Sequence, residues 1–273
     1  MTGPVDSSGR SRSEGSSGAV IGRAGLGVVG WGTADEGGRV RPGPNSSFRL
    51  FQFAGIDVYL HWLWFVVAVF QVQRRGDGDG DLTWRVAEYL ALFAIVLLHE
   101  FGHALATRQV GGNADTILLW PFGGVAYVSP PFRPGAQLWG LAAGPLVNVV
   151  LAFPLTWLAR ASGGSGVDSV LSNWAVFVQN VWWINAGLFL FNMLPVYPLD
   201  GGQILRSLLW FVIGPVRSLY VATCVGFVGV LALLALAVVW HSLWLGIMAL
   251  FIGSNCWQGW RQARMLSAVY GDR

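Results

Sequence analysis

The chain alternates between long apolar stretches and short polar connections. A helix needs about 20 apolar residues to cross the hydrocarbon part of a bilayer, and most of these stretches approach that length. A shorter helix over residues 204–213, ended by Gly214 and Pro215, is expected before the fifth stretch. The pattern predicts an all-α polytopic membrane protein with about six transmembrane helices, over approximately residues 58–72, 84–107, 137–159, 174–194, 218–239 and 243–257.

One apolar region is too short and too interrupted to cross a bilayer. Thr116–Ser129 consists of two β-prone runs on either side of a Pro-Phe-Gly-Gly turn, which predicts a small membrane-associated β-hairpin. An exposed edge of such a hairpin can bind an extended peptide by strand addition. A lid packed on the helices explains the same pattern equally well.

The two ends of the chain are polar. Residues 1–47 are rich in Gly, Ser and Arg and predict a disordered tail. Residues 48–260 are expected to form the membrane domain, and residues 261–273 a C-terminal tail. All 17 basic residues are arginines, and most of them fall on the inner side if both termini are cytoplasmic. We therefore expect a multi-pass protein with both termini in the cytoplasm, in the cell membrane if the source is prokaryotic.

Composition excludes several classes of protein. The chain is 54% hydrophobic and 11% charged, whereas soluble domains contain about 25% charged residues. The formal net charge of +3 is too small and too dispersed to indicate nucleic-acid binding. Cys224 and Cys256 lie in apolar runs without a CxxC partner, so we interpret both as small packing residues.

A His-Glu-x-x-His motif lies in the second apolar stretch. His99 and His103 are one helical turn apart, so both imidazoles can bind one metal ion. Glu100 is about 100° around the helix from His99, the place of a general base. Such a short motif also occurs by chance over buried histidines. Ionisable groups at membrane depth are costly, however, and this favours a metal site.

Asp200 is the candidate third ligand. It follows the fourth apolar stretch in the sequence Pro-Leu-Asp-Gly-Gly, and two histidines with one carboxylate leave a position open for chemistry. A helix N-cap is the alternative role for this aspartate.

Two further polar residues have open roles. Asn148 follows the small residues Gly140 and Gly144, which permit close helix packing, and it either braces a metal ligand or bonds across helices. His61 is expected to bond a backbone or a headgroup, and a contribution to the metal site is left open.

Together these motifs resemble those of the site-2 protease family of intramembrane zinc metalloproteases. The resemblance covers residues 48–260. We expect no PDZ domain, because there is no room for one between the third and fourth predicted spans, and no CBS pair after the sixth. The chain therefore most resembles the compact subgroup of the family, which is similar to the sporulation factor processing protease. The resemblance implies that His99, His103 and Asp200 bind one Zn²⁺ per chain and that Glu100 is the catalytic base. It also implies that Asn148 and Asn192 support the substrate or transition state, and that a strand binds the substrate through Phe122, Gly123 and Gly124.

The function that the resemblance implies is hydrolysis of peptide bonds in or near transmembrane segments, as in regulated intramembrane proteolysis. The expected partners are the lipid bilayer and a substrate with a transmembrane helix, with a homo-oligomer or a regulatory membrane partner left open. A metal-ion transporter and an inactive membrane scaffold are the alternatives. Glu100 argues against a transporter, since ion passage needs ligands but no base beside them.

Overall fold

The computed structural model describes residues 32–34, 40–42, 47–74, 82–120, 123–162 and 169–270. The helices in this part of the chain are α1 Leu63–Arg74, α2 Leu82–Gln109, α3 Pro134–Ser162, α4 Ser169–Asn192, α5 Asp200–Val239 and α6 Leu243–Tyr270. By length and composition, four helical segments among the described residues can cross a membrane. These are Leu82–Gln109, Pro134–Ser162, Asn173–Asn192 and Asp200–Val239. The predicted integral membrane fold thus has four candidate spans, and the count of six is not confirmed.

The first predicted span is wrong as a continuous helix. Its beginning belongs to a strand, β4 (Ile56–His61), and only α1 follows. The 12 residues of α1 rise about 18 Å, which is short of the roughly 30 Å hydrocarbon core. The strand forms because alternate side chains are buried, namely Ile56, Val58 and Leu60.

The last two predicted spans differ in outcome. The fifth lies in α5, which has a non-helical residue at Gly214 (φ 81°, ψ 171°) just before Pro215. The predicted break between a short helix and a longer one is therefore confirmed. The sixth lies in α6, which is not among the four candidate spans, because polar residues from Ser254 onward interrupt its apolar run.

A four-stranded sheet has the order β3-β4-β5-β6. The strands are β3 Ser47–Phe53, β4, β5 Asn113–Trp120 and β6 Gly123–Ser129. β5 and β6 are antiparallel, which confirms the predicted hairpin, and β4 runs parallel to β5. Two further strands, β1 Gly32–Ala34 and β2 Val40–Pro42, pair within the predicted tail. The rest of residues 1–46 lies outside the described residues, so its disorder stays a prediction.

The sheet is held against α2 at two places. Its buried aliphatic side chains pack on Phe101 and Ala104 of α2. At the turn between β3 and β4, Ala54 and Gly55 have positive φ angles of 50° and 72°. The Arg108 guanidinium donates hydrogen bonds to the carbonyls of both turn residues, at 2.5 and 2.9 Å. These contacts fix the position of the sheet relative to the helix that carries the His-Glu-x-x-His motif.

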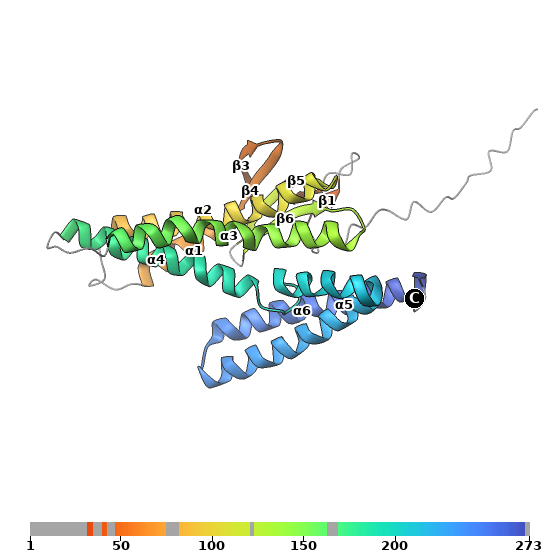
Figure 1. Cartoon of the computed structure of the whole chain (residues 1–273). Coiled ribbons are helices and arrows are strands. Elements are labelled where there is room, and N and C mark those ends of the chain that lie inside the picture. The colour runs from red at the N-terminus through yellow and green to blue at the C-terminus, as the bar shows by residue number, and fades with distance from the viewer. Residues whose placement is uncertain are drawn as a thin grey trace, which may run out of the picture.

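Small residues allow the backbones of α2 and α3 to touch. A Cβ added at Gly102 would lie 2.7 Å from the carbonyl oxygen of Ala143, and one at Gly140 would lie 3.0 Å from Thr107 Oγ1. Close approach through small residues is a common means of helix association in membranes. Figure 1 shows α2, α3 and α4 side by side, with the α5–α6 pair below them and the sheet on the opposite side of α2.

Candidate metal centre

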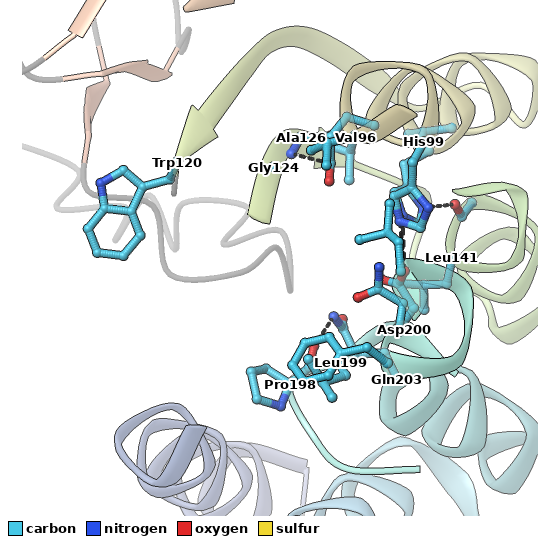
Figure 2. Close-up of a pocket in the computed structure, with 18 of the residues that line it drawn as sticks. Val96, His99, Trp120, Gly124, Ala126, Leu141, Pro198, Leu199, Asp200 and Gln203 are labelled. Carbon is cyan, nitrogen blue, oxygen red and sulfur yellow. Dashed lines mark hydrogen bonds and ion pairs between the residues drawn. The ribbon is translucent and has the colours of Figure 1, made fainter. Parts of the chain in front are cut away.

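Three predicted ligands converge from two helices that are distant in sequence. His99 and His103 lie on α2, and Asp200 is the first residue of α5. Nε2 of His99 lies 3.0 Å from Asp200 Oδ2, and Nε2 of His103 lies 3.3 Å from the same oxygen. The two Nε2 atoms are 3.1 Å apart. Figure 2 shows His99 and Asp200 reaching toward one another at one side of a pocket.

The turn before α5 explains the two glycines that follow Asp200. A Cβ added at Gly201 would overlap the carbonyl oxygen of Met193, and one at Gly202 would overlap the backbone nitrogen of Tyr197. The segment that precedes α5 can therefore pack against the first turn of this helix only if both positions are glycine. The N-cap of α5 is Leu199, so the predicted alternative role of Asp200 as the cap is wrong.

The hydrogen bonds of the two histidines fit a metal ion. Nδ1 of His99 lies 2.6 Å from Asn148 Oδ1, and Nδ1 of His103 lies 2.8 Å from the Gly140 carbonyl oxygen. Both oxygens are acceptors, so each Nδ1 carries the proton and each neutral ring presents the lone pair of Nε2. Two lone pairs and one carboxylate oxygen then face a single point, an arrangement that a cation satisfies.

The spacing of these atoms is compatible with a tetrahedral zinc ion. Four ligands at about 2.0–2.1 Å in a tetrahedron lie roughly 3.3–3.4 Å from one another. The three contacts of 3.0, 3.1 and 3.3 Å come close to that spacing. Two imidazoles and one carboxylate are also the ligand types of catalytic zinc sites, which keep the fourth position open.

The side chain of Glu100, a residue of α2, faces strand β6 of the sheet. Its side chain is only 6% exposed, and its Oε2 accepts a hydrogen bond of 3.1 Å from the backbone nitrogen of Ala126 in β6. Gly124 of the same strand faces this carboxylate, because a Cβ added there would overlap Glu100 Cγ. Glu100 and the three candidate ligands line one pocket. The arrangement places a carboxylate beside the metal position without using it as a ligand.

The other predicted site residues lie at different distances from this centre. Asn148 contacts His99 directly, whereas Asn192, the last residue of α4, lines the pocket. Nδ1 of His61 accepts a hydrogen bond from the backbone nitrogen of Leu63 at the start of α1, and His61 is not among the pocket residues. Gly123 pairs with Trp120 in the hairpin, and Phe122 lies outside the described residues.

One site residue was missed in the sequence. Asn185 of α4 is 2% exposed and hydrogen bonds to Asn148, which in turn contacts His99. Its only signal in the sequence is an amide within an apolar helix, which does not reveal its partner. Of the two predicted packing cysteines, Cys256 is buried and donates to the carbonyl oxygen of Tyr197, whereas Cys224 is exposed.

The proteins that this chain resembles include a zinc metalloprotease and a site-2 protease. The chain is 29% identical to a zinc metalloprotease of Methanocaldococcus jannaschii over 76% of its own length and 59% of that protein. It is also 29% identical to stage IV sporulation protein FB of Bacillus subtilis, over 55% of this chain and 46% of that protein. The chain therefore spans about half the length of these curated relatives. A solved structure, the site-2 protease from Methanocaldococcus jannaschii, superposes with a TM-score of 0.54 at 25% identity, covering 78% of this chain and 94% of that one.

A family model covers the part of the chain that carries the proposed ligands. The model described as peptidase family M50 matches residues 87–173 and 165–236, which together make up more than half of the sequence. These ranges contain His99, Glu100, His103 and Asp200. The chain belongs to peptidase family M50.

Proposed function

We propose that this protein is an intramembrane zinc metalloprotease that hydrolyses peptide bonds in or near the transmembrane segments of membrane proteins. The observation that carries the proposal is that His99, His103 and Asp200 each place a possible ligand atom within 4.8 Å of the other two. Glu100 lines the same pocket. These residues lie in a chain of peptidase family M50 whose long apolar helices suit a membrane. Glu100 also distinguishes a protease from a transporter or an inactive scaffold, because neither of these needs a base beside the ligands.

The roles of the side chains follow from their chemistry. A zinc ion held by the three ligands would supply Lewis-acid activation of a water molecule and of the scissile carbonyl. Glu100 takes a proton from that water at its carboxylate and later delivers a proton to the nitrogen of the leaving amine. Asn192 lines the pocket and has an amide that can donate to the developing oxyanion. Asn148 acts through His99, whose ring it holds.

The free edge of the sheet is the proposed place for the substrate backbone. β6 stands at one end of the described four-stranded sheet. The N–H of Ala126 points away from β5, since it donates to Glu100. An extended peptide that pairs with this edge would replace Glu100 as the partner of the Ala126 N–H and would lie beside the released carboxylate. The proposed role of Phe122, Gly123 and Gly124 in holding the peptide extends this edge toward the hairpin turn.

This mode of binding sets a requirement on the substrate. The carbonyls of a transmembrane helix are engaged in its own hydrogen bonds, so the substrate helix must unwind locally before it can pair with β6. A substrate segment with weak helix propensity, such as one with Gly or Asn, meets this requirement most easily. We further propose that both termini are cytoplasmic, because most of the arginines then fall on the inner side.

The proposal is tested with two variants in parallel. Glu100→Gln and His99→Ala are purified, and each is co-expressed with a panel of tagged single-span membrane proteins. Glu100→Gln should retain zinc and lose cleavage, because the amide cannot accept the proton, whereas His99→Ala should lose both. Cleavage by Glu100→Gln at the wild-type rate would contradict the assigned base.

A further inference from the structure

A pair of buried asparagines joins α3 and α4 behind His99. Asn148 and Asn185 are 1% and 2% exposed. Nδ2 of Asn148 donates to Oδ1 of Asn185, and Nδ2 of Asn185 donates to the backbone carbonyl oxygen of Asn148, both at 2.9 Å. The remaining amide oxygen of Asn148 lies 2.6 Å from Nδ1 of His99. The pair thus links α4, which supplies no candidate metal ligand, to a ligand on α2.

The orientation of both amides is determined from one end of this chain of hydrogen bonds. A backbone carbonyl can only accept, so the atom of Asn185 that faces it must be the amide nitrogen. The oxygen of Asn185 then faces Asn148, which must present its own nitrogen there. This leaves the oxygen of Asn148 toward His99, and Nδ1 of His99 must be the protonated nitrogen.

The tautomers of the two histidines are determined by acceptors of different rigidity. Nδ1 of His103 faces the carbonyl oxygen of Gly140, which is part of a helix backbone and cannot rotate. Nδ1 of His99 faces a side-chain amide, which has two orientations of nearly the same shape. In the wrong orientation Asn148 would present a donor to Nδ1, and the proton of His99 would move to Nε2. That proton would occupy the direction in which the metal is bound.

We propose that Asn185 is a positioning residue for the metal centre. It holds the amide of Asn148 in the orientation that keeps the lone pair of His99 Nε2 directed at Asp200 and the metal. The inference rests on the proposed function, in which His99 is a zinc ligand. Partners that orient a ligating histidine contribute about 10–100-fold to metal affinity or activity, so the loss of Asn185 should fall in this range.

The test compares two asparagines of the same helix. Asn185→Leu removes both hydrogen bonds at similar volume. Asn180→Leu is the matched control, because Asn180 donates to Glu88 of α2 and is not among the residues that line the pocket. Zinc affinity of the full chain in detergent is measured by chelator competition. Asn185→Leu should bind zinc about 10–100-fold more weakly than the wild type, and Asn180→Leu should bind it unchanged. Equal affinity of Asn185→Leu and the control would overturn the proposal.

A double variant separates positioning from general damage. If Asn185 acts only through Asn148, the variant Asn148→Leu/Asn185→Leu should bind zinc no more weakly than Asn148→Leu alone. Additive losses would show an independent structural role and would also overturn the proposal. Nitrogen NMR of labelled histidine in the zinc-loaded protein provides a second readout. The signal of His99 Nδ1, which bonds to Asn148, should shift in Asn185→Leu and stay unchanged in Asn180→Leu.

The experiment also distinguishes this inference from the proposed function. His99→Ala is measured in the same series. If His99→Ala binds zinc as tightly as the wild type, the proposed metal centre is wrong. If His99→Ala loses zinc and Asn185→Leu does not, only the role of Asn185 is wrong.

Discussion

The substitution Gly144→Ala tests how closely α3 is fitted to the metal centre. The three atoms nearest to a Cβ added at this position are Nε2, Cε1 and Cδ2 of His103, and the added carbon would overlap the ring. A carbon atom needs roughly 3.5 Å from such atoms, so the ring must move by on the order of 1 Å. Metal–ligand bonds tolerate about 0.2 Å.

Separation of α2 from α3 to make room for the new methyl group would break a close backbone contact. A Cβ at Gly102 would already lie 2.7 Å from the carbonyl oxygen of Ala143, so the two backbones are in contact next to Gly144. We therefore expect the ring of His103 to take up the displacement. We expect zinc affinity to fall by about 100-fold, at the upper end of the range for neighbours of a ligand, because here the ligand itself moves.

The assay measures zinc affinity by chelator competition and cleavage at limiting zinc. Gly187→Ala is the matched control, since a Cβ at this position in α4 has no neighbour within 4 Å. It should leave zinc affinity unchanged and stabilise the helix by about 0.5–1 kcal/mol. Zinc binding by Gly144→Ala with wild-type affinity would refute the close fit of α3 against His103.

Three more predictions follow from single contacts. Gly124→Val should abolish cleavage but retain zinc, because the new side chain would displace Glu100 and not a ligand; loss of zinc in a metal analysis would contradict this. Arg108→Met should increase hydrogen exchange at the turn of Ala54 and Gly55 and destabilise the sheet by about 1–2 kcal/mol; unchanged exchange would exclude the anchoring role. Asp200→Asn should weaken zinc binding by well over tenfold, since the charged oxygen that faces both histidines is lost; wild-type affinity would remove Asp200 from the ligand set.

The sequence predicted the candidate site better than the fold around it. The spacing of His99 and His103 on a helix and the lone carboxylate of Asp200 were enough to predict a shared site, because each residue type has few other uses at membrane depth. Asn185 could not be assigned in the same way. An amide in an apolar helix acquires a role only through its partner, and the pairing of α3 with α4 is a tertiary contact.

The error in the first span has a different origin. Ile56, Val58 and Leu60 alternate with more polar residues, a period-2 pattern typical of a strand. This pattern runs directly into the apolar residues of α1, so the two elements together resembled one span. The parallel pairing of β4 with β5 joins segments more than 50 residues apart, and no local pattern predicts such a pairing.

X-ray absorption at the zinc edge of the purified protein is the most direct test of the metal centre. We expect one zinc ion per chain with two imidazole nitrogens and one carboxylate oxygen at about 2.0–2.2 Å. The Asp200→Ala variant should lose the oxygen ligand, and the His103→Ala variant should lose one nitrogen. A stoichiometric zinc ion whose spectrum is the same in all three proteins would contradict the assignment of these residues as its ligands.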